Sequence, residues 1–425
     1  MQFPIRALAF VLAAASAHAD VQTAESTDPL TLAEVRRIAE TVSPAVRSSE
    51  ARLIGAEGAR REAASFFFNN PELSADRTRR RAPAQDGIAS EWGLGISQSF
   101  EIGGQQQRRR EEAMASLESL RAEIEDARRQ ARAEASMRFQ AVLSAQRSLQ
   151  LEQRSVELFD STLMAVTRRR RAGEDTRLDA NVALIEAERA INALAVSRER
   201  LQGARAELAA VLQLPPSVLP DVIGELEVPS ELALPYDLEQ LLASARASPK
   251  LSALAARKNA ARARVALEHA SRYPDVTIGM RTGRDGLSDS RERTTTLSLA
   301  VPLPLFRRNE AAIGQALTEE AQAETDIAVV MRDRQAEVLQ FWKRLDSQRL
   351  RVARLQRAMV AASTENRQLA AKSRQAGQIG LLDQLLINRQ ALDAERDLNE
   401  ALAEFHTTRI ELENAAGWSQ EGIVR

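Results

Sequence analysis

The 425-residue sequence contains no cysteine. Disulfides, thiolate metal sites and a cysteine nucleophile are therefore excluded, and so is an anchor on a lipid-modified N-terminal cysteine. Histidine is also scarce, with three residues, and the sequence motifs of serine hydrolases, nucleotide-binding proteins and zinc peptidases are missing. We therefore expect a protein that is not an enzyme and that holds no cofactor and no metal.

Aromatic residues make up only 4% of the chain, and it has 18 glycines. Both values are low for a globular enzyme, and much of the apolar share is alanine, which is typical of long packed helices. The 58 basic and 59 acidic residues nearly cancel, and this balance argues against binding to nucleic acid. The composition therefore predicts a protein built from long helices.

Long hydrophobic runs are also lacking, so no membrane-spanning helix is predicted. The first segment, Met1–Ala19, contains one arginine, a short apolar run and an Ala-x-Ala end. This pattern indicates a secretory signal peptide that is cleaved before Asp20. The apolar run is too short to cross about 30 Å of hydrocarbon. We therefore expect residues 1–19 to be removed and the mature chain to be exported.

The sequence does contain an internal duplication. The helix-start pair Ser43-Pro44 recurs as Ser248-Pro249, and Ala172-Gly173 recurs as Ala376-Gly377. Several landmarks recur in one order at a near-constant offset of about 204 residues, which predicts two tandem repeats. We place the units of the chain at 20–213 for the first repeat, 214–236 for a proline-rich linker, 237–418 for the second repeat and 419–425 for a C-terminal tail.

Each repeat is expected to contain a very long helix followed by a shorter return helix. No proline or glycine interrupts the segment from Gln105 to about Arg170, where apolar residues recur every three or four positions. At about 1.5 Å per residue this helix forms a rod near 100 Å long. The return helix is expected at 176–214, and the second repeat has the same pair at about 309–375 and 381–417.

Four shorter segments alternate apolar and polar residues and predict one β-hairpin in each repeat, at about 71–102 and 274–305. The clearest strands are Trp92–Phe100 and Thr296–Leu303. Polar turns are expected at 79–89 and 283–291, so Arg79–Arg81 would lie in a turn. Aromatic residues are expected near the strand ends, as in the girdle of a membrane barrel, at Trp92, Phe100, Tyr273 and Phe306.

Each segment is about as long as a tilted transmembrane strand, which needs roughly 9–11 residues. Two ordinary hairpins on a soluble domain would show the same alternation. In a membrane, four strands with open edges would leave backbone groups unsatisfied, so other copies of the chain must close the sheet. Three copies give twelve strands and a water-filled lumen. The fold class predicted is therefore mainly α with a small β part.

The ends of the long helices carry the candidate site. Asp179 and Asp383 occupy equivalent positions, one turn into each return helix. In a trimer they would place up to six carboxylates around one opening, which favours cations. Aspartate in a first helical turn also stabilises the helix start, whatever its other role. Further residues of these ends are candidates for contact with a partner: Arg170, Arg171, Gly173, Glu174, Gly377 and Gln378.

The signal peptide, the two repeats and the glycine-marked breaks before Leu178-Asp179 and Leu382-Asp383 resemble the TolC-like outer-membrane efflux family. The resemblance covers nearly the whole mature chain. Three motifs resemble the CzcC-like branch, which serves heavy-metal and cation efflux pumps: Asn70-Pro71-Glu72-Leu73, Ser99–Gly104 and Val301–Asn309.

The resemblance implies a homotrimer in outer-membrane lipid, with a twelve-stranded barrel continued across the periplasm by a twelve-helix tunnel. It also implies docking to an inner-membrane RND-type pump through a periplasmic adaptor, the membrane fusion protein. Asp179 and Asp383 match acidic positions near the periplasmic aperture of the family. Leu386 and Ile379 depart from the pattern, because they stand where the family has a second aspartate and a basic residue.

The expected function is therefore a passive exit duct for substrates that a pump delivers, with heavy-metal cations as the expected substrate class. A duct for drug efflux or type I secretion would use the same architecture. A periplasmic coiled-coil scaffold with soluble hairpins is the alternative from a different class of protein.

Overall fold

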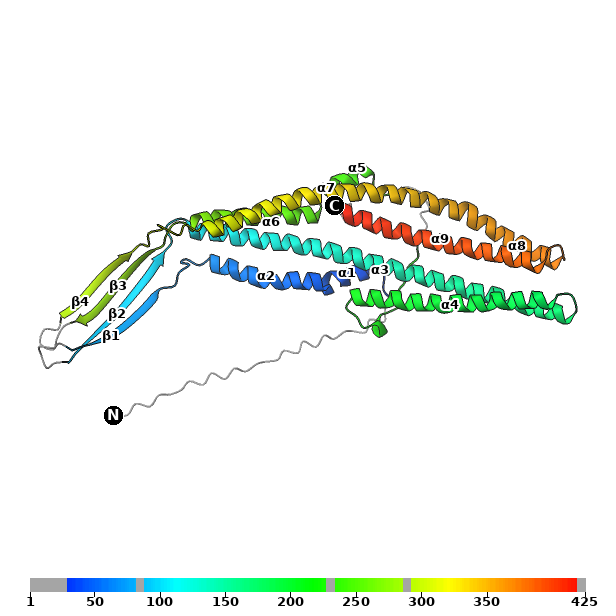
Figure 1. The fold of residues 1–425 in the computed structure, drawn as a ribbon, viewed down its shortest axis with the longest axis horizontal. Coiled ribbons are helices and arrows are strands. Elements are labelled where there is room, and N and C mark those ends of the chain that lie inside the picture. The colour runs from blue at the N-terminus through cyan, green and yellow to red at the C-terminus, as the bar shows by residue number, and fades with distance from the viewer. Residues whose placement is uncertain (1–28, 82–87, 227–233, 286–291, 419–425) are drawn as a thin grey trace, which may run out of the picture.

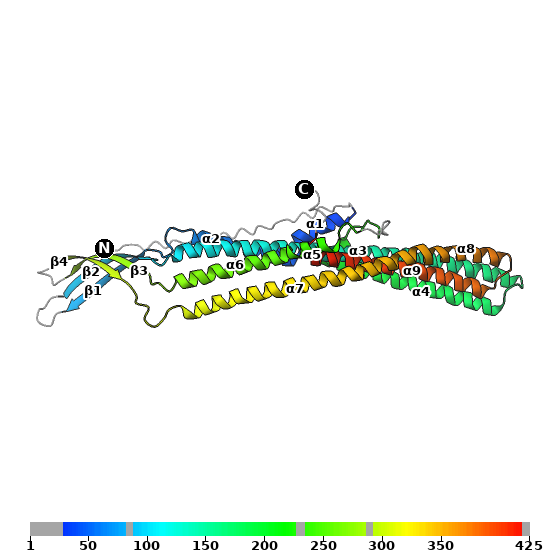
Figure 2. The ribbon, with the colours of Figure 1, turned by 90° about the horizontal axis from the view of Figure 1, so that it is seen from above.

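The computed structural model describes residues 29–81, 88–226, 234–285 and 292–418. The molecule is a long rod of side-by-side helices with a sheet projecting from one end (Figures 1 and 2). The predicted signal peptide at 1–19 and tail at 419–425 lie outside the described residues, as does part of the predicted linker.

The first repeat begins with two short helices whose starts follow from local chemistry. The Thr31 side chain and Glu34 form a reciprocal capping box, and Pro44 takes the first position of the next helix, where no N–H is needed. The elements of this repeat are α1 (Leu32–Val42), α2 (Pro44–Ala63), β1 (Glu72–Arg81), β2 (Ile88–Phe100), α3 (Gln105–Arg171) and α4 (Arg177–Val211).

The second repeat has the same order of elements. A short 3-10 turn, η1 (Pro216–Val218), precedes it. Its elements are α5 (Leu238–Arg246), α6 (Pro249–Ala270), β3 (Val276–Asp285), β4 (Glu292–Ala300), α7 (Glu310–Arg354), the π-helical segment η2 (Leu355–Val360), α8 (Ala361–Gln375) and α9 (Leu381–Ala416).

The two long helices were predicted closely. Helix α3 spans 67 residues without a break, within one residue of the predicted bounds. In the second repeat α7, η2 and α8 form one continuous helical path over the predicted 309–375, but six of its residues are π-helical. The return helices α4 and α9 also lie where they were predicted.

Three hydrophobic clusters hold the rod together. One lies in the first repeat, around Phe139 and Leu208, and one in the second, around Leu345 and Phe405. The third joins the two repeats where α3, α4 and α9 end or begin, far from the sheet. Many of its members are alanines of α4, and these small side chains let the helices approach closely.

The two hairpins form one antiparallel sheet in the order β1-β2-β3-β4. The hairpin of each repeat joins the other through β2 and β3, with Ile96 opposite Met280. Within this chain β1 and β4 are edge strands, so one side of each carries backbone groups that no strand of the described residues pairs.

The strand ends differ from the prediction in both hairpins. Arg79–Arg81 belong to β1 and not to a turn, because their backbone continues the ladder opposite Ser90, Ala89 and Ile88. Strand β3 likewise runs on to Asp285. Strand β4 begins earlier than predicted and stops at Ala300, because Pro302 cannot donate to a ladder.

Candidate functional site

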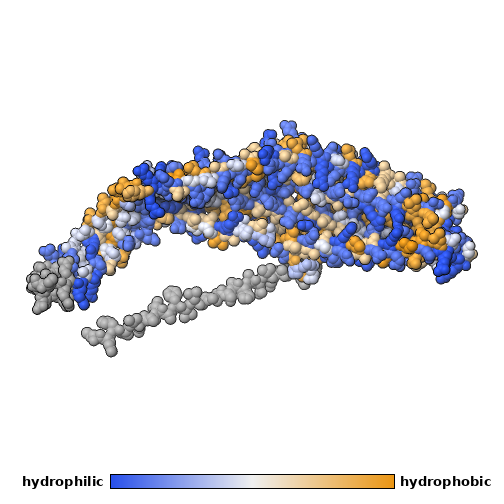
Figure 3. Space-filling view, viewed as in Figure 1, coloured by the Kyte–Doolittle hydropathy of each residue, from blue (hydrophilic) through white to orange (hydrophobic). Residues whose placement is uncertain are grey.

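The predicted site lies at the end of the rod opposite the sheet, where α3 turns into α4 and α8 turns into α9 (Figure 1). We call residues 162–186 and 370–389 the helical tip. Apolar side chains gather on the surface near this end and again where the sheet meets the helices (Figure 3).

Glycine makes both turns of the helical tip. Gly173 has φ +84 and Gly377 φ +72, a left-handed conformation that other residues adopt at a cost. Beyond α3, the Glu174 N–H donates to the Arg169 carbonyl at 2.9 Å, and the Gly173 N–H also bonds back into the last turn. The turn after α8 repeats both bonds, through Gln378 and Gly377. This is the pattern with which a glycine closes a helix.

The six residues proposed for partner contact all lie on the surface of these turns. Arg170 and Arg171 end α3, and Glu174 and Gln378 follow the two glycines, all with exposed side chains.

Asp179 and Asp383 are helix-capping residues in the structure. Oδ2 of Asp179 accepts from the Thr176 N–H at 2.9 Å and from the Thr176 hydroxyl at 2.6 Å. The bonds from Thr176 hold the pKa of this carboxyl below its ordinary value, with a smaller contribution from the charge of Arg374. Asp383 accepts from the Gly380 N–H at 3.1 Å, and glycine has no hydroxyl to add a second bond. Capping therefore explains why an aspartate stands at each position.

Capping does not exclude the predicted role at an aperture. Both aspartates lie at the same end of the rod, beside one hydrophobic cluster. Ala180 follows Asp179, and Leu381 precedes Asp383 by two residues. Both apolar residues belong to the hydrophobic cluster that joins the two repeats. The structure thus brings the two predicted aspartates to one end of the rod.

The charged centre of the helical tip is a residue that sequence reasoning missed. Asp175 is almost fully buried, with 6% of its side chain exposed. Its Oδ1 accepts from Nη2 of Arg374 at 2.9 Å, and its Oδ2 lies 3.4 Å from Nε of Arg169. Arg374 also donates to the Ile379 carbonyl at 3.3 Å. One carboxylate of the first repeat therefore holds an arginine of each repeat.

Further ion pairs tie the repeats together along the rod, and two of them have short contacts. The Glu186 carboxylate accepts from Arg389 at 2.8 and 3.0 Å. Farther from the helical tip, Glu152 accepts from Arg396 at 2.7 and 2.8 Å. The bond to Glu152 raises the pKa of the Arg396 guanidinium, although partial burial acts in the opposite direction.

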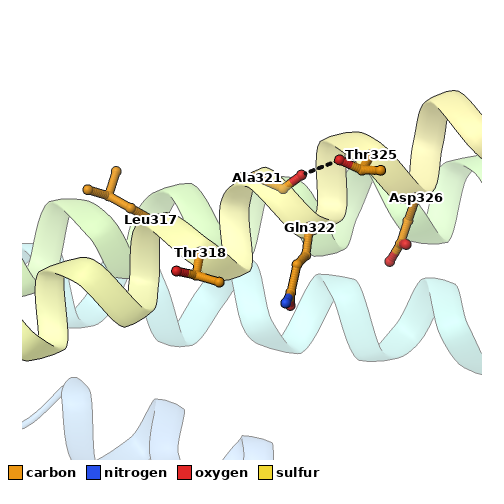
Figure 4. A pocket seen from close by; sticks show the side chains of 6 residues that line it. All are labelled: Leu317, Thr318, Ala321, Gln322, Thr325 and Asp326. Carbon is orange, nitrogen blue, oxygen red and sulfur yellow. Dashed lines mark hydrogen bonds between the residues drawn. The ribbon is translucent and has the colours of Figure 1, made fainter.

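A surface depression on α7 offers no comparable site. Its lining comes from this one helix, between Leu317 and Asp326, and its side chains diverge along the helix (Figure 4). The Thr325 hydroxyl is used within the helix, where it donates to the Ala321 carbonyl at 2.9 Å. Across residues 29–418, gaps excepted, no group of three or more His, Asp or Glu is arranged to hold a metal ion. No helix among them is long and apolar enough to span a membrane.

Two segments of the chain, 35–212 and 241–418, each match the family described as outer membrane efflux protein. These segments make up most of the sequence. The chain therefore belongs to the outer membrane efflux protein family, whose members are efflux channels of the outer membrane, as the sequence resemblance predicted.

Individual relatives agree with this family. The cobalt-zinc-cadmium resistance protein CzcC of Cupriavidus metallidurans is 26% identical over 382 residues, which cover 89% of this chain and 86% of that protein. Solved structures that share the fold include VceC and CusC. VceC of Vibrio cholerae has a TM-score of 0.72 at 19% identity, covering 91% of this chain and 96% of that one. CusC has a TM-score of 0.74 at 16% identity, covering 91% and 92%.

Proposed function

We propose that this protein is the passive exit duct of a tripartite efflux system and that heavy-metal cations are its substrates. The duct is a homotrimer in the outer membrane with a long periplasmic extension. A periplasmic adaptor connects it to an inner-membrane RND-type pump, which selects the substrate and supplies the energy. The protein itself performs no chemical step. The mature chain begins at residue 20, with repeats at 20–213 and 237–418 joined by 214–236.

The sheet carries the proposal furthest, because it is incomplete in one chain. Its apolar side chains are exposed, as at Leu73, Leu297 and Leu299, which keep 79%, 78% and 70% of their surface. Its edge strands β1 and β4 pair on one side only among the strands that the structure describes. Lipid would cover the apolar face, and β4 of one copy would pair with β1 of the next. Three copies of the sheet then close a twelve-stranded barrel.

The helices are compatible with the same stoichiometry. Each copy contributes α3, α4, the α7–α8 path and α9, so three copies place twelve long helices around one axis. Large apolar side chains at the helical tip are exposed in the single chain, at Leu178, Leu382 and Leu386. In a soluble monomer these side chains would remain in water, whereas neighbouring copies would bury them.

The helical tip fits a cation-conducting aperture. Three copies contribute six carboxylates from Asp179 and Asp383, and such a ring lowers the energy of a cation in a narrow pore. The depressed pKa of Asp179 keeps its carboxylate charged near neutral pH. The adaptor would meet the outermost surface of the turns, where Arg170, Arg171 and Gln378 are exposed. The name of CzcC, a cobalt-zinc-cadmium resistance protein, supports divalent cations as the substrate class.

A paired substitution tests the aperture. Asn at both positions, Asp179→Asn with Asp383→Asn, keeps oxygens that can cap the helices but removes all six charges. We expect the reconstituted wild-type channel to be blocked by millimolar divalent cations added from the side of the helical tip. The Asn variant should lose about 10-fold in sensitivity to block, while its trimer stays heat-resistant. Unchanged block in a folded Asn variant would contradict the ring.

Substrate and architecture need separate measurements. Deleting the gene should raise cellular zinc, cobalt or cadmium and leave drug accumulation unchanged. The opposite result would favour a drug-efflux duct. A water-soluble monomer that forms no channel would contradict the duct altogether and favour the periplasmic scaffold.

A further inference from the structure

One row of residues crosses all four strands of the sheet. In the ladder Arg77 pairs with Trp92, Trp92 pairs with Arg284, and Arg284 pairs with Arg293. Residues directly opposite each other in an antiparallel sheet point to the same face. The row therefore places three guanidinium groups and one indole side by side on one face. We call these four residues the arginine row.

The arginine row shares its face with the apolar residues of the sheet. The next rows toward the helices include Leu94, Ile96 and Met280, each about half exposed or more. From Phe100 to Trp92 is eight positions, or about 27 Å along the strand, and a tilt near 40° reduces this to about 21 Å along the barrel axis. An outer-membrane barrel carries an apolar band about 25 Å tall. The arginine row thus lies at the edge of that band farther from the helices.

The two faces of the sheet differ sharply in charge. By the register, the face opposite the arginine row carries these acidic residues: Glu72, Asp76, Glu91, Asp285 and Glu292. Arg281 lies on this acidic face and pairs with Asp76. Most of the cations thus lie on the face opposite the carboxylates, and Arg281, on the acidic face, is paired with one of them.

The guanidinium groups of the row have no acidic partner within the described part of the chain. Arg77 donates from Nε to the Ser90 hydroxyl at 3.1 Å, which leaves its terminal nitrogens available. Arg284 and Arg293 are exposed. Three exposed guanidinium groups at the border of an apolar surface fit an anionic group whose remainder is apolar.

We propose that the arginine row binds the phosphate groups of anionic lipids in the outer leaflet of the membrane. This inference rests on the proposed function, which places the sheet in the outer membrane with its hairpin turns outside. Each guanidinium presents a fork of donors to phosphate oxygens, and the Trp92 ring lies between two of them at the interface, a depth that tryptophan favours. The acyl chains then cover the apolar rows below. The lipid would hold the barrel at a fixed depth without a covalent anchor.

The test measures binding of fluorescent lipid A with two phosphates to the purified full-length protein in dodecyl maltoside micelles. The variant Arg77→Gln, Arg284→Gln, Arg293→Gln should bind about 100-fold more weakly, since one basic residue at an anionic surface contributes roughly fivefold. The corresponding triple Lys variant should keep most of the affinity. The matched control removes three exposed charges at the other end of the rod, with Gln at Arg168, Arg170 and Arg171, and should bind as the wild type does.

Three results would overturn the inference. The triple Gln variant could bind lipid A as tightly as the wild type, or lipid A without phosphates could bind as well as the phosphorylated form. Inorganic phosphate at 10 mM, about a hundredfold excess over lipid, could also displace lipid A, which would indicate a site for free anions. Each variant is first tested for a heat-resistant trimer and for conductance in neutral phosphatidylcholine bilayers. Absence of channels in the wild type would instead contradict the proposed function.

Discussion

The helical tips of the two repeats differ at the position just before the return helix. The first repeat has the buried carboxylate of Asp175 there, and the second repeat has Ile379. The same difference appears farther along the return helices, where Glu186 of the first repeat corresponds to Gln390 of the second. Two copies with one fold thus carry different charges at matching places.

Each of these carboxylates meets an arginine of the other repeat. Within the described ranges, four ion pairs join an acid of the first repeat to an arginine of the second: Asp76–Arg281, Glu152–Arg396, Asp175–Arg374 and Glu186–Arg389. Among the same described residues, Arg154–Glu395 has the opposite polarity; this pair is longer, at 3.5 Å, and its arginine is largely exposed.

This polarity indicates which neighbour the long helix and return helix of each repeat prefer. A first repeat beside a second repeat places carboxylates against guanidinium groups, whereas two repeats of the same kind would place like charges together. In a trimer of six units, such charges favour strict alternation of first and second repeats. The hydrophobic seams alone specify this order poorly, because alanine and leucine are present in both repeats.

The largest effect is expected from removing the acid at the centre of the helical tip. Asp175→Ala leaves Arg374 and Arg169 without this carboxylate, and Arg374 is mostly buried. Breaking a buried pair in this way should cost about 2 kcal/mol after allowance for partial exposure. That cost corresponds to roughly a 30-fold shift of the equilibrium toward a state in which the α3–α4 turn and the α8–α9 turn are separated. Single-channel recordings should show a more frequently open, more conductive pore.

A charge swap separates this interaction from a general loss of packing. In Asp175→Arg with Arg374→Asp the pair is restored with reversed polarity, so conductance should return toward the wild-type value. The single variant Arg374→Asp should be as open as Asp175→Ala. A double variant that stays fully open would show that the two residues are not coupled and that the Asp175–Arg374 pair does not hold the two repeats together.

Substitution of Glu186, the other acid that the second repeat lacks, should have a smaller effect on channel opening. Glu186→Gln gives the first repeat the residue type that the second repeat has at 390 and removes the charge that holds Arg389. Because about half of the Arg389 side chain is exposed, the loss should be about 0.7 kcal/mol, or threefold in open probability. Gln390→Ala is the matched control and should change neither conductance nor the melting of the trimer. Equal effects of both substitutions would contradict the proposed difference in charge between the two repeats.

The sequence was sufficient for the helices because their ends carry local signals. Gly173 and Gly377 mark the turns, Pro44 marks a start, and the stretch after Gln105 lacks any residue that would stop a helix. The hairpins were predicted from alternation, but their length was not. Arginine is not a usual strand residue, and the extension of β1 to Arg81 depends on pairing with β2, which no local pattern indicates.

The ion pairs between the repeats could not be predicted in the same way. Asp175 and Arg374 are 199 residues apart, and only the packing of α3 and α4 against α8 and α9 brings them together. One local signal was available, since the offset of the repeats aligns an aspartate with Ile379. A charge present in one copy and absent in the other indicates a partner outside the repeat, without identifying it.

The smallest effect is expected at the N-terminal caps of α4 and α9, where the two repeats are nearly alike. Asp179 accepts two bonds from Thr176, and Asp383 accepts one from Gly380, so Asp179→Ala should cost about 1 kcal/mol and Asp383→Ala about half as much. The pKa of Asp179 is lowered on folding, so its contribution is complete above the unfolded value and is lost as pH falls through the folded one. The melting difference between wild type and Asp179→Ala should therefore be constant from about pH 5 to 8 and shrink below about pH 4. A difference that instead shrinks near pH 6 would contradict the lowered pKa of Asp179 and the stabilising role of the bonds from Thr176.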